Sequence, residues 1–278
     1  MLASFRWLLR NRDMETKYKD RLRQSINLIA APGMWILSTL PQMTNWGRSA
    51  SEFSEANQSL LVPYGIAFSI WLPIFIGCIG YAVLQAMKTN RSRDIFRKTG
   101  WWTAAGFTCV CIWALFSGWA SGQISLWGTA LIFIPAVLCL VKAMLILTHN
   151  KTALDKTERL WVWLPISLIA GWTSLAMFLN WTPIAMNFMG TSVPDIVPNL
   201  VMLALALIFA VAVIRKSAGN IVYTFPIAWG LSWLAFKAIT TNATPEIIGF
   251  AAVAGLVIVG LSAFIFRKAR ESFSAQRI

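Results

Sequence analysis

Long apolar stretches recur along the 278-residue chain and are separated by short polar segments. A hydrocarbon core about 30 Å thick requires about 20 apolar residues of helix. Eight stretches approach or exceed this length, and they predict an all-α polytopic membrane bundle of about eight transmembrane helices. They cover residues 24–43, 64–87, 99–119, 122–147, 160–181, 197–214, 220–239 and 245–266. The first is the weakest, because it is short and contains Pro32 and Gly33.

Composition excludes several other classes of protein. Hydrophobic residues make up 57% of the chain and charged residues 13%, with a mean hydropathy of +0.62. Soluble domains average about 45–50% apolar and about 25% charged residues. A soluble globular enzyme, a disordered protein and a disulfide-stapled secreted domain are therefore all excluded. The four cysteines lie inside apolar runs, where we expect them to be free packing residues.

The basic residues indicate how the chain is oriented. The net charge is +13, and most Lys and Arg lie in the leader, in alternate loops and in the tail, whereas the other loops contain only Arg48. Cytoplasmic loops of membrane proteins are enriched in Lys and Arg, so both termini are predicted to be cytoplasmic, in the inner (cell) membrane. This distribution explains the basicity through the lipid bilayer, and we expect no nucleic-acid partner.

The leader, residues 1–23, is basic and lacks the continuous apolar region of a cleavable signal peptide. Its apolar residues permit a short amphipathic helix on the membrane surface, and a frayed basic tail is the alternative. The tail, residues 267–278, is also basic and is predicted to be cytoplasmic.

Few side chains inside the predicted spans carry acid–base chemistry. Lys142 and Lys237 are the strongly ionisable ones, and each either reaches the interface or faces an acidic ligand group. With one histidine and no buried carboxylate pair, we expect no catalytic residue and no metal site.

Tryptophan is unusually frequent, with 15 residues. Several lie at predicted interfaces, as membrane proteins commonly show. Trp71, Trp113 and Trp172 lie within spans, where the indole N–H favours protein, water or ligand over lipid. The interior indoles either line a flat-walled ligand pocket or pack the helices together. Asn180, at the outer end of its span, either orients a ligand or bonds a neighbouring helix.

Three segments resemble the TspO/MBR family of tryptophan-rich sensory, translocator-protein-like membrane proteins. VPYGIAFSIWLPIFIGCIGYAVLQ is similar to its signature helix, CIWALFSGW to its third helix and LWVWLPISLIAGWTSLAMFLN to its last core helix. The chain looks closest to a longer subgroup with extra C-terminal helices. The resemblance implies a five-helix bundle over residues 24–183 and three additional transmembrane helices over 184–266.

The resemblance also implies an apolar ligand cavity under the first interhelical loop. Pro63, Trp71, Trp172 and Asn180 match the family motifs, and Phe68 and Trp113 complete the candidate ligand-binding set. The expected ligand is a tetrapyrrole such as porphyrin or heme, a sterol-like molecule, a chlorophyll-type pigment or a carotenoid. Tyr64-Gly65 replaces the family's doubled proline and its Trp, and Phe68 lies one residue nearer Trp71 than usual.

Three functions remain open from the sequence. The first is binding of an apolar planar ligand for sensing, regulation or transport. The second is a non-catalytic accessory subunit of a larger membrane complex, which contains pigment in one version of this hypothesis. The third is an enzyme that degrades or isomerises the ligand, although no catalytic constellation supports it. The sequence leaves both a homodimer and a larger membrane complex open.

Overall fold

The computed structural model describes residues 2–44, 46–57, 59–190 and 195–275, and describes side chains between residues 14 and 272 of these ranges. The regular structure in these ranges is helical, with no strand, which confirms the predicted all-α class. The helices are α1 (Leu2–Thr44), α2 (Ala50–Ala56), α3 (Trp71–Ala86), α4 (Asp94–Trp119), α5 (Gly122–His149), α6 (Lys156–Glu158), α7 (Leu164–Phe188), α8 (Ile196–Lys216), α9 (Ile221–Thr240) and α10 (Glu246–Ala275). Short helical turns η1 (Gly65–Ile70), η2 (Lys151–Ala153) and η3 (Arg159–Trp163) connect some of them.

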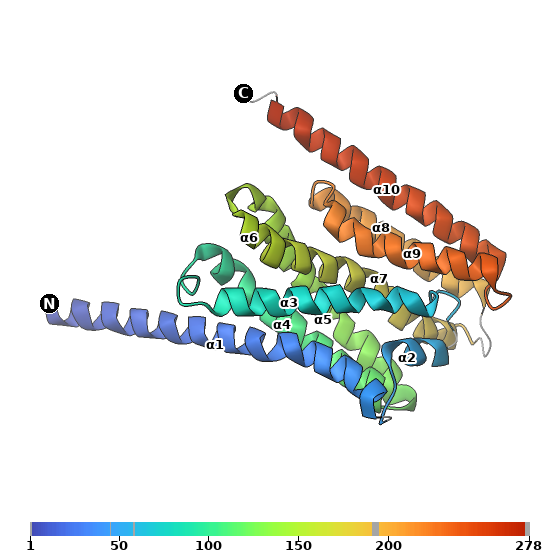
Figure 1. Cartoon of the computed structure of the whole chain (residues 1–278), viewed down its shortest axis with the longest axis horizontal. Helices are drawn as coiled ribbons and strands as arrows, with labels where there is room; N and C mark the ends of the chain where they lie inside the picture. The colour runs from blue at the N-terminus through green and yellow to red at the C-terminus, as the bar shows by residue number, and fades with distance from the viewer. Residues whose placement is uncertain (1, 45, 58, 191–194, 276–278) are drawn as a thin grey trace.

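The long helices run back and forth along one common axis, so the connections gather at two opposite ends (Figure 1). One end, which we call the basic end, holds both chain termini and the connections α3–α4, α5–α7 and α8–α9. The opposite end, which we call the α2 end, holds α2 and the connections α4–α5, α7–α8 and α9–α10. The loops predicted to be rich in Lys and Arg therefore lie at one end of the bundle, and the loops poor in them lie at the other.

Six segments of the described chain are long and apolar enough to cross a membrane: 65–86, 94–119, 122–149, 156–188, 196–216 and 246–272. Together they confirm a polytopic membrane bundle. The other two predicted spans lie in α1 and α9, which are not among the six. In α9 the aromatic, hydroxyl and glycine residues of YTFPIAWGLSW lower the mean hydropathy, yet this helix packs between α7 and α10.

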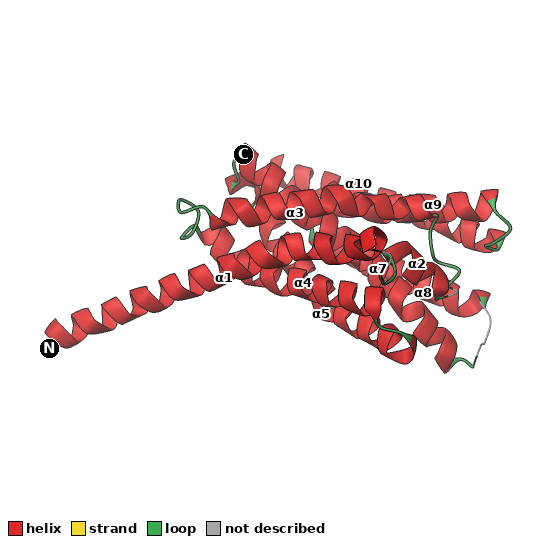
Figure 2. Ribbon diagram, turned by 60° about the horizontal axis from the view of Figure 1, so that its bottom comes forward, coloured by secondary structure: helices red, strands yellow, loops and turns green. Residues whose placement is uncertain are grey.

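Helix α1 joins the leader and the first predicted span. It continues through Pro32 and Pro41, and its first turns project beyond the bundle (Figure 2). An ideal Cβ on Gly33 would lie 3.3 Å from the Cys111 Sγ of α4, and that thiol donates to the Ala30 carbonyl at 3.3 Å. Close packing against α4 thus supports the helix at the proline. The amphipathic alternative for residues 2–9 concerns side chains outside the described residues, and the domain boundaries remain predictions.

The α2 end contains helix beyond the predicted spans. Ser49 and Glu52 form a capping box that starts α2, and the backbone N–H of Ser49 lowers the pKa of the Glu52 carboxyl group. Helix α7 ends at Phe188, seven residues beyond the end of the span predicted over residues 160–181. The helix continues because Ile184 and Met186 are buried against the bundle.

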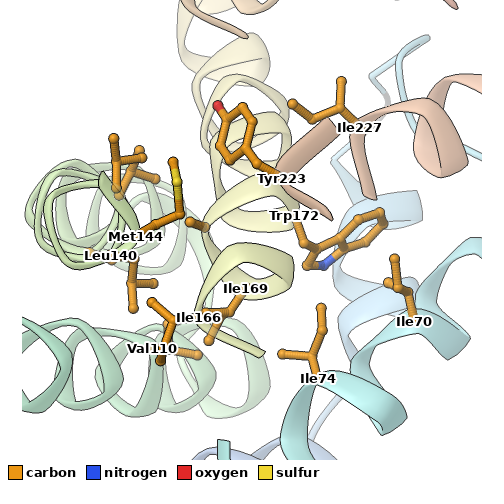
Figure 3. Close-up of a cluster of buried hydrophobic side chains, with 14 of the residues drawn as sticks. Ile70, Ile74, Val110, Leu140, Met144, Ile166, Ile169, Trp172, Tyr223 and Ile227 are labelled. Carbon is orange, nitrogen blue, oxygen red and sulfur yellow. The ribbon is translucent and has the colours of Figure 1, made fainter. Parts of the chain in front are cut away.

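Helix α7 lies at the centre of the structure. Figure 3 shows Ile166 and Ile169 facing Val110 of α4 on one side, while Trp172 lies among residues of η1, α3 and α9. A Cβ on Gly171 would collide with the Tyr223 carbonyl oxygen of α9, so this glycine permits close contact between the two helices. Because lipid is as apolar as these side chains, close packing rather than hydrophobicity holds such helices together.

Candidate functional site

Three interior indoles from three helices meet near the α2 end. Trp71 of α3 stacks on Trp113 of α4 with ring centroids 6.2 Å apart, and it meets Trp172 of α7 edge-on at 6.2 Å. Their exposed fractions are 7%, 5% and 4%. These indoles therefore contact protein rather than lipid, as the polar N–H group favours.

Neighbouring phenylalanines extend this set, which we call the aromatic cluster. The turn η1 places Phe68 three residues before Trp71, a spacing that aligns side chains in a 3₁₀ helix. Phe68 meets the edge of Trp172 at 6.1 Å, and Phe53 of α2 meets Trp113 at 6.4 Å. The altered spacing of Phe68 thus still brings its ring to the cluster, and α2 covers the cluster from the α2 end.

The amide of Asn180 is already engaged by the cluster. Its Oδ1 accepts a hydrogen bond from Trp113 Nε1 at 3.1 Å, and its Nδ2 donates to the Ala176 carbonyl at 2.8 Å. Trp172 Nε1 differs, because it is buried and has no hydrogen-bond partner among the described residues. A buried donor without a partner is costly. A ligand acceptor that bonded to the Trp172 N–H would remove this cost, so Trp172 is the polar group of the site that is available to a ligand.

A small apolar cavity adjoins the cluster. Pro63 and Trp172 line it, and it leaves about 20 Å³ of room for water-sized groups, about enough for a single water molecule. The remaining lining residues come from the segment before η1 and from α7, α8 and α9: Leu61, Leu175, Ala176, Phe178, Leu179, Leu203, Ala206, Gly230, Leu231 and Leu234.

The six candidate residues thus lie together, but the cavity extends toward α8 and α9 rather than staying among the first five helices. Gly230 makes this arrangement feasible, because a Cβ there would lie 2.5 Å from Leu175 Cδ2 and 3.4 Å from the Trp172 ring. Sequence reasoning missed the contribution of α8 and α9, and the glycine within a tryptophan-rich helix was the available signal.

The segment of residues 59–64, which we call the lid segment, closes the cavity and is held by hydrogen bonds. Asn199 Oδ1 of α8 accepts from the backbone N–H of Leu60 at 2.9 Å. Lys237 Nζ of α9 donates to the Val62 carbonyl at 3.1 Å. Lys237 therefore binds the protein backbone, while Lys142 is exposed on α5.

Two further indoles, Trp229 and Trp233, tie α9 to η1 and to the residue before it. Trp229 Nε1 donates to the Ala67 carbonyl at 2.9 Å, and Trp233 stacks on Tyr64 at 6.3 Å. These contacts draw the added helices against the candidate site. Among the described residues, no group of three or more His, Cys, Asp or Glu side chains could hold a metal ion.

A broad apolar groove lies on the other side of α7, between α5 and α8. It leaves about 500 Å³ of room for water-sized groups, and Leu138, Trp181 and Leu205 are among its lining residues. Phe178 lines both this groove and the small cavity. The side chain of Phe178 therefore lies between an open apolar surface and the closed site.

Comparison with protein families found one that covers most of the chain. The model of a family described as TSPO-like protein matches residues 24–265, a range that includes α8, α9 and nearly all of the apolar part of α10. Searches of curated proteins and of solved structures found no match.

Proposed function

Because the chain belongs to the TSPO-like protein family, we propose that it binds an apolar planar ligand at the aromatic cluster, for sensing, regulation or transport. The observation that carries this proposal is Trp172. Its ring lines an apolar cavity, and its buried N–H lacks an acceptor among the described residues. A ligand with a flat apolar body and a polar edge would satisfy both features.

Tetrapyrroles, sterols and carotenoids are the ligand classes that this chemistry suits. All are far larger than the present cavity, since pockets for small molecules commonly span about 300–1,000 Å³. Binding therefore requires the site to open. The lid segment is the element to move, because its hydrogen bonds to Asn199 and Lys237 and the contacts of Tyr64 with Trp233 can be released without breaking a long helix.

The groove between α5 and α8 offers a route for an apolar ligand from the membrane. Rotation of the Phe178 side chain would join the groove to the cavity, because this ring lines both. In this scheme the ligand never crosses water, as befits a molecule dissolved in lipid. We propose no catalytic role for these residues and no metal.

A titration of the full-length protein in detergent with protoporphyrin, followed by tryptophan fluorescence, tests the proposal. We expect saturable quenching that weakens at least fivefold in Trp172→Phe and is unchanged in Trp101→Phe, a matched change at an indole that is 42% exposed at the basic end. Quenching that never saturates, or that both variants alter equally, would contradict it.

The apolar groove also favours a second function, that of an accessory subunit in a larger membrane complex. In that case a partner's helix, rather than lipid or ligand, would cover residues such as Leu138 and Leu205. Purification in mild detergent distinguishes the two. A stoichiometric large assembly favours the accessory subunit, whereas a monomer or homodimer that binds protoporphyrin favours the ligand-binding protein.

The distribution of basic residues also supports an orientation in the membrane. We propose that the protein lies in the inner (cell) membrane with its basic end, and hence both termini, in the cytoplasm, because Lys and Arg concentrate at that end.

A further inference from the structure

A second large cavity lies at the basic end, far from the aromatic cluster. The α5–α7 connection, the α8–α9 turn and the last turns of α10 enclose it, and it leaves about 540 Å³ of room for water-sized groups. Four basic side chains line it, namely Lys151, Arg159, Arg267 and Arg270. Glu271 is the one carboxylate among the described lining residues.

The four cations face a shared space. Lys151 Nζ lies 3.7 Å from the centroid of the Trp163 ring, which holds the ammonium group against the wall. Burial lowers the pKa of Lys151, and the guanidinium groups of Arg159, Arg267 and Arg270 lower it further. The charges thus lie within electrostatic range and repel one another, which a bound anion would relieve.

Two other carboxylates at this end are already paired. Asp20 binds Arg97 at 2.6 Å, and Glu158 binds Arg93 at 2.9 Å. Within the cavity, Glu271 pairs with Arg267 at 3.1 Å, with both side chains exposed. Among its described lining residues, the cavity therefore has four cations and one carboxylate.

The floor of the cavity is a fixed polar structure rather than a loose loop. Asn220 caps α9 by accepting from the backbone N–H groups of Val222 and Tyr223. Its Nδ2 donates to the hydroxyl groups of Thr148 and Ser167, both at 3.1 Å. These bonds join α5, α7 and α9 directly beneath the basic side chains.

The turn before α9 brings α10 over this floor. Gly219 has φ +72°, and a Cβ there would lie 2.6 Å from the Arg267 backbone nitrogen. Such close contact requires glycine and sets the basic side chains of α10 near the positive end of the α9 dipole.

We propose that this cavity binds a phosphate group, carried by the headgroup of an anionic membrane lipid or by a soluble phosphate ion. Several guanidinium groups and an ammonium group are the donors that bind phosphate oxygens most strongly. Basic pockets between helices at the membrane surface have this chemistry. Ile221 and Val222 line the same cavity where α9 enters the bundle, which provides an apolar side for lipid chains.

The test uses the full-length protein purified in a non-ionic detergent. Native mass spectrometry measures retention of phosphatidylglycerol against phosphatidylcholine, and thermal unfolding measures binding of inorganic phosphate and pyrophosphate. The test variant is Lys151→Gln with Arg270→Gln. The matched control is Lys268→Gln with Arg215→Gln, which removes the same two types of charge at the same end outside the cavity.

We expect the wild-type protein to retain phosphatidylglycerol or to bind phosphate, with affinity about tenfold lower in the test variant and unchanged in the control. Lipid retention without phosphate binding identifies the headgroup as the source, and saturable phosphate binding identifies the soluble ion. Equal losses in both variants, or no loss in either, would overturn the proposal. If the test variant is not monodisperse, the single exposed change Arg267→Gln replaces it and is judged by the same criteria.

Discussion

The hydrogen bond between Trp113 and Asn180 can be measured as an energy. Asn180→Leu keeps the branched shape and the number of side-chain heavy atoms but removes the acceptor 3.1 Å from Trp113 Nε1. Trp113 is 5% exposed and Asn180 is 8% exposed, so water cannot easily replace the lost partner. An unpaired buried donor costs about 1–3 kcal/mol, whereas hydrogen bonds between membrane helices are worth about 0.6 kcal/mol on average and up to about 1.7.

From these bounds, we expect Asn180→Leu to lower the free energy of unfolding by about 1–2 kcal/mol. Trp113→Phe removes the donor and retains a ring against Phe133, whose centroid lies 5.2 Å from that of Trp113. In the double variant the two costs should overlap by about 1 kcal/mol, because the same bond is lost once. Unfolding in mixed detergent micelles, followed by circular dichroism, measures all four proteins.

The control cycle pairs Asn180→Leu with Trp102→Phe, an indole that is 41% exposed at the basic end. Those two costs should add within about 0.5 kcal/mol. If the Trp113 and Asn180 costs also add, the bond does not stabilise the helices. The assignment of Asn180 to the structure of the cluster would then be refuted.

Three further results are expected. Gly171→Ala should destabilise the protein by about 1–3 kcal/mol in the same unfolding assay because its Cβ meets the Tyr223 carbonyl, whereas Gly260→Ala, with nothing within 4 Å, should not. The protection of α2 against hydrogen exchange, relative to the intrinsic rate at each pH, should fall as pH falls through the lowered pKa of Glu52, since the capping contribution is complete only above the unfolded value of about 4.3; Glu52→Gln should remove this change in protection. Lys237→Met should speed protoporphyrin association in stopped-flow quenching because it removes one of the bonds that hold the lid segment, and an unchanged rate would show that this bond does not limit entry.

Hydropathy alone predicted the membrane-embedded helices well, because lipid imposes a minimum length of apolar helix. The span predicted over residues 122–147 is the helix α5, Gly122–His149. Hydropathy made the span over residues 24–43 the weakest because of Pro32, and it could not show the contact with Cys111, about 80 residues away, that supports α1 there. The extension of α7 to Phe188 was also missed, since burial of Ile184 by other helices is invisible in a local pattern.

At the candidate site, the sequence predicted which indoles are buried but not which partners they have. The polar N–H of indole predicted that Trp71, Trp113 and Trp172 avoid lipid, and their burial confirms it. Which indole has a partner could not be predicted, because the acceptor for Trp113 lies 67 residues away in Asn180. The lid contacts of α8 and α9 likewise depend on how distant helices pack.

The most direct measurement of the central claim is the indole region of a ¹⁵N–¹H spectrum of the full-length protein in micelles, with and without saturating protoporphyrin. The Trp172 signal is assigned by its loss in Trp172→Phe. A ligand that meets the Trp172 N–H, which has no partner among the described residues, should move that signal strongly and leave Trp101, at the basic end, in place. A stationary Trp172 signal, or equal movement of both signals, would contradict the account.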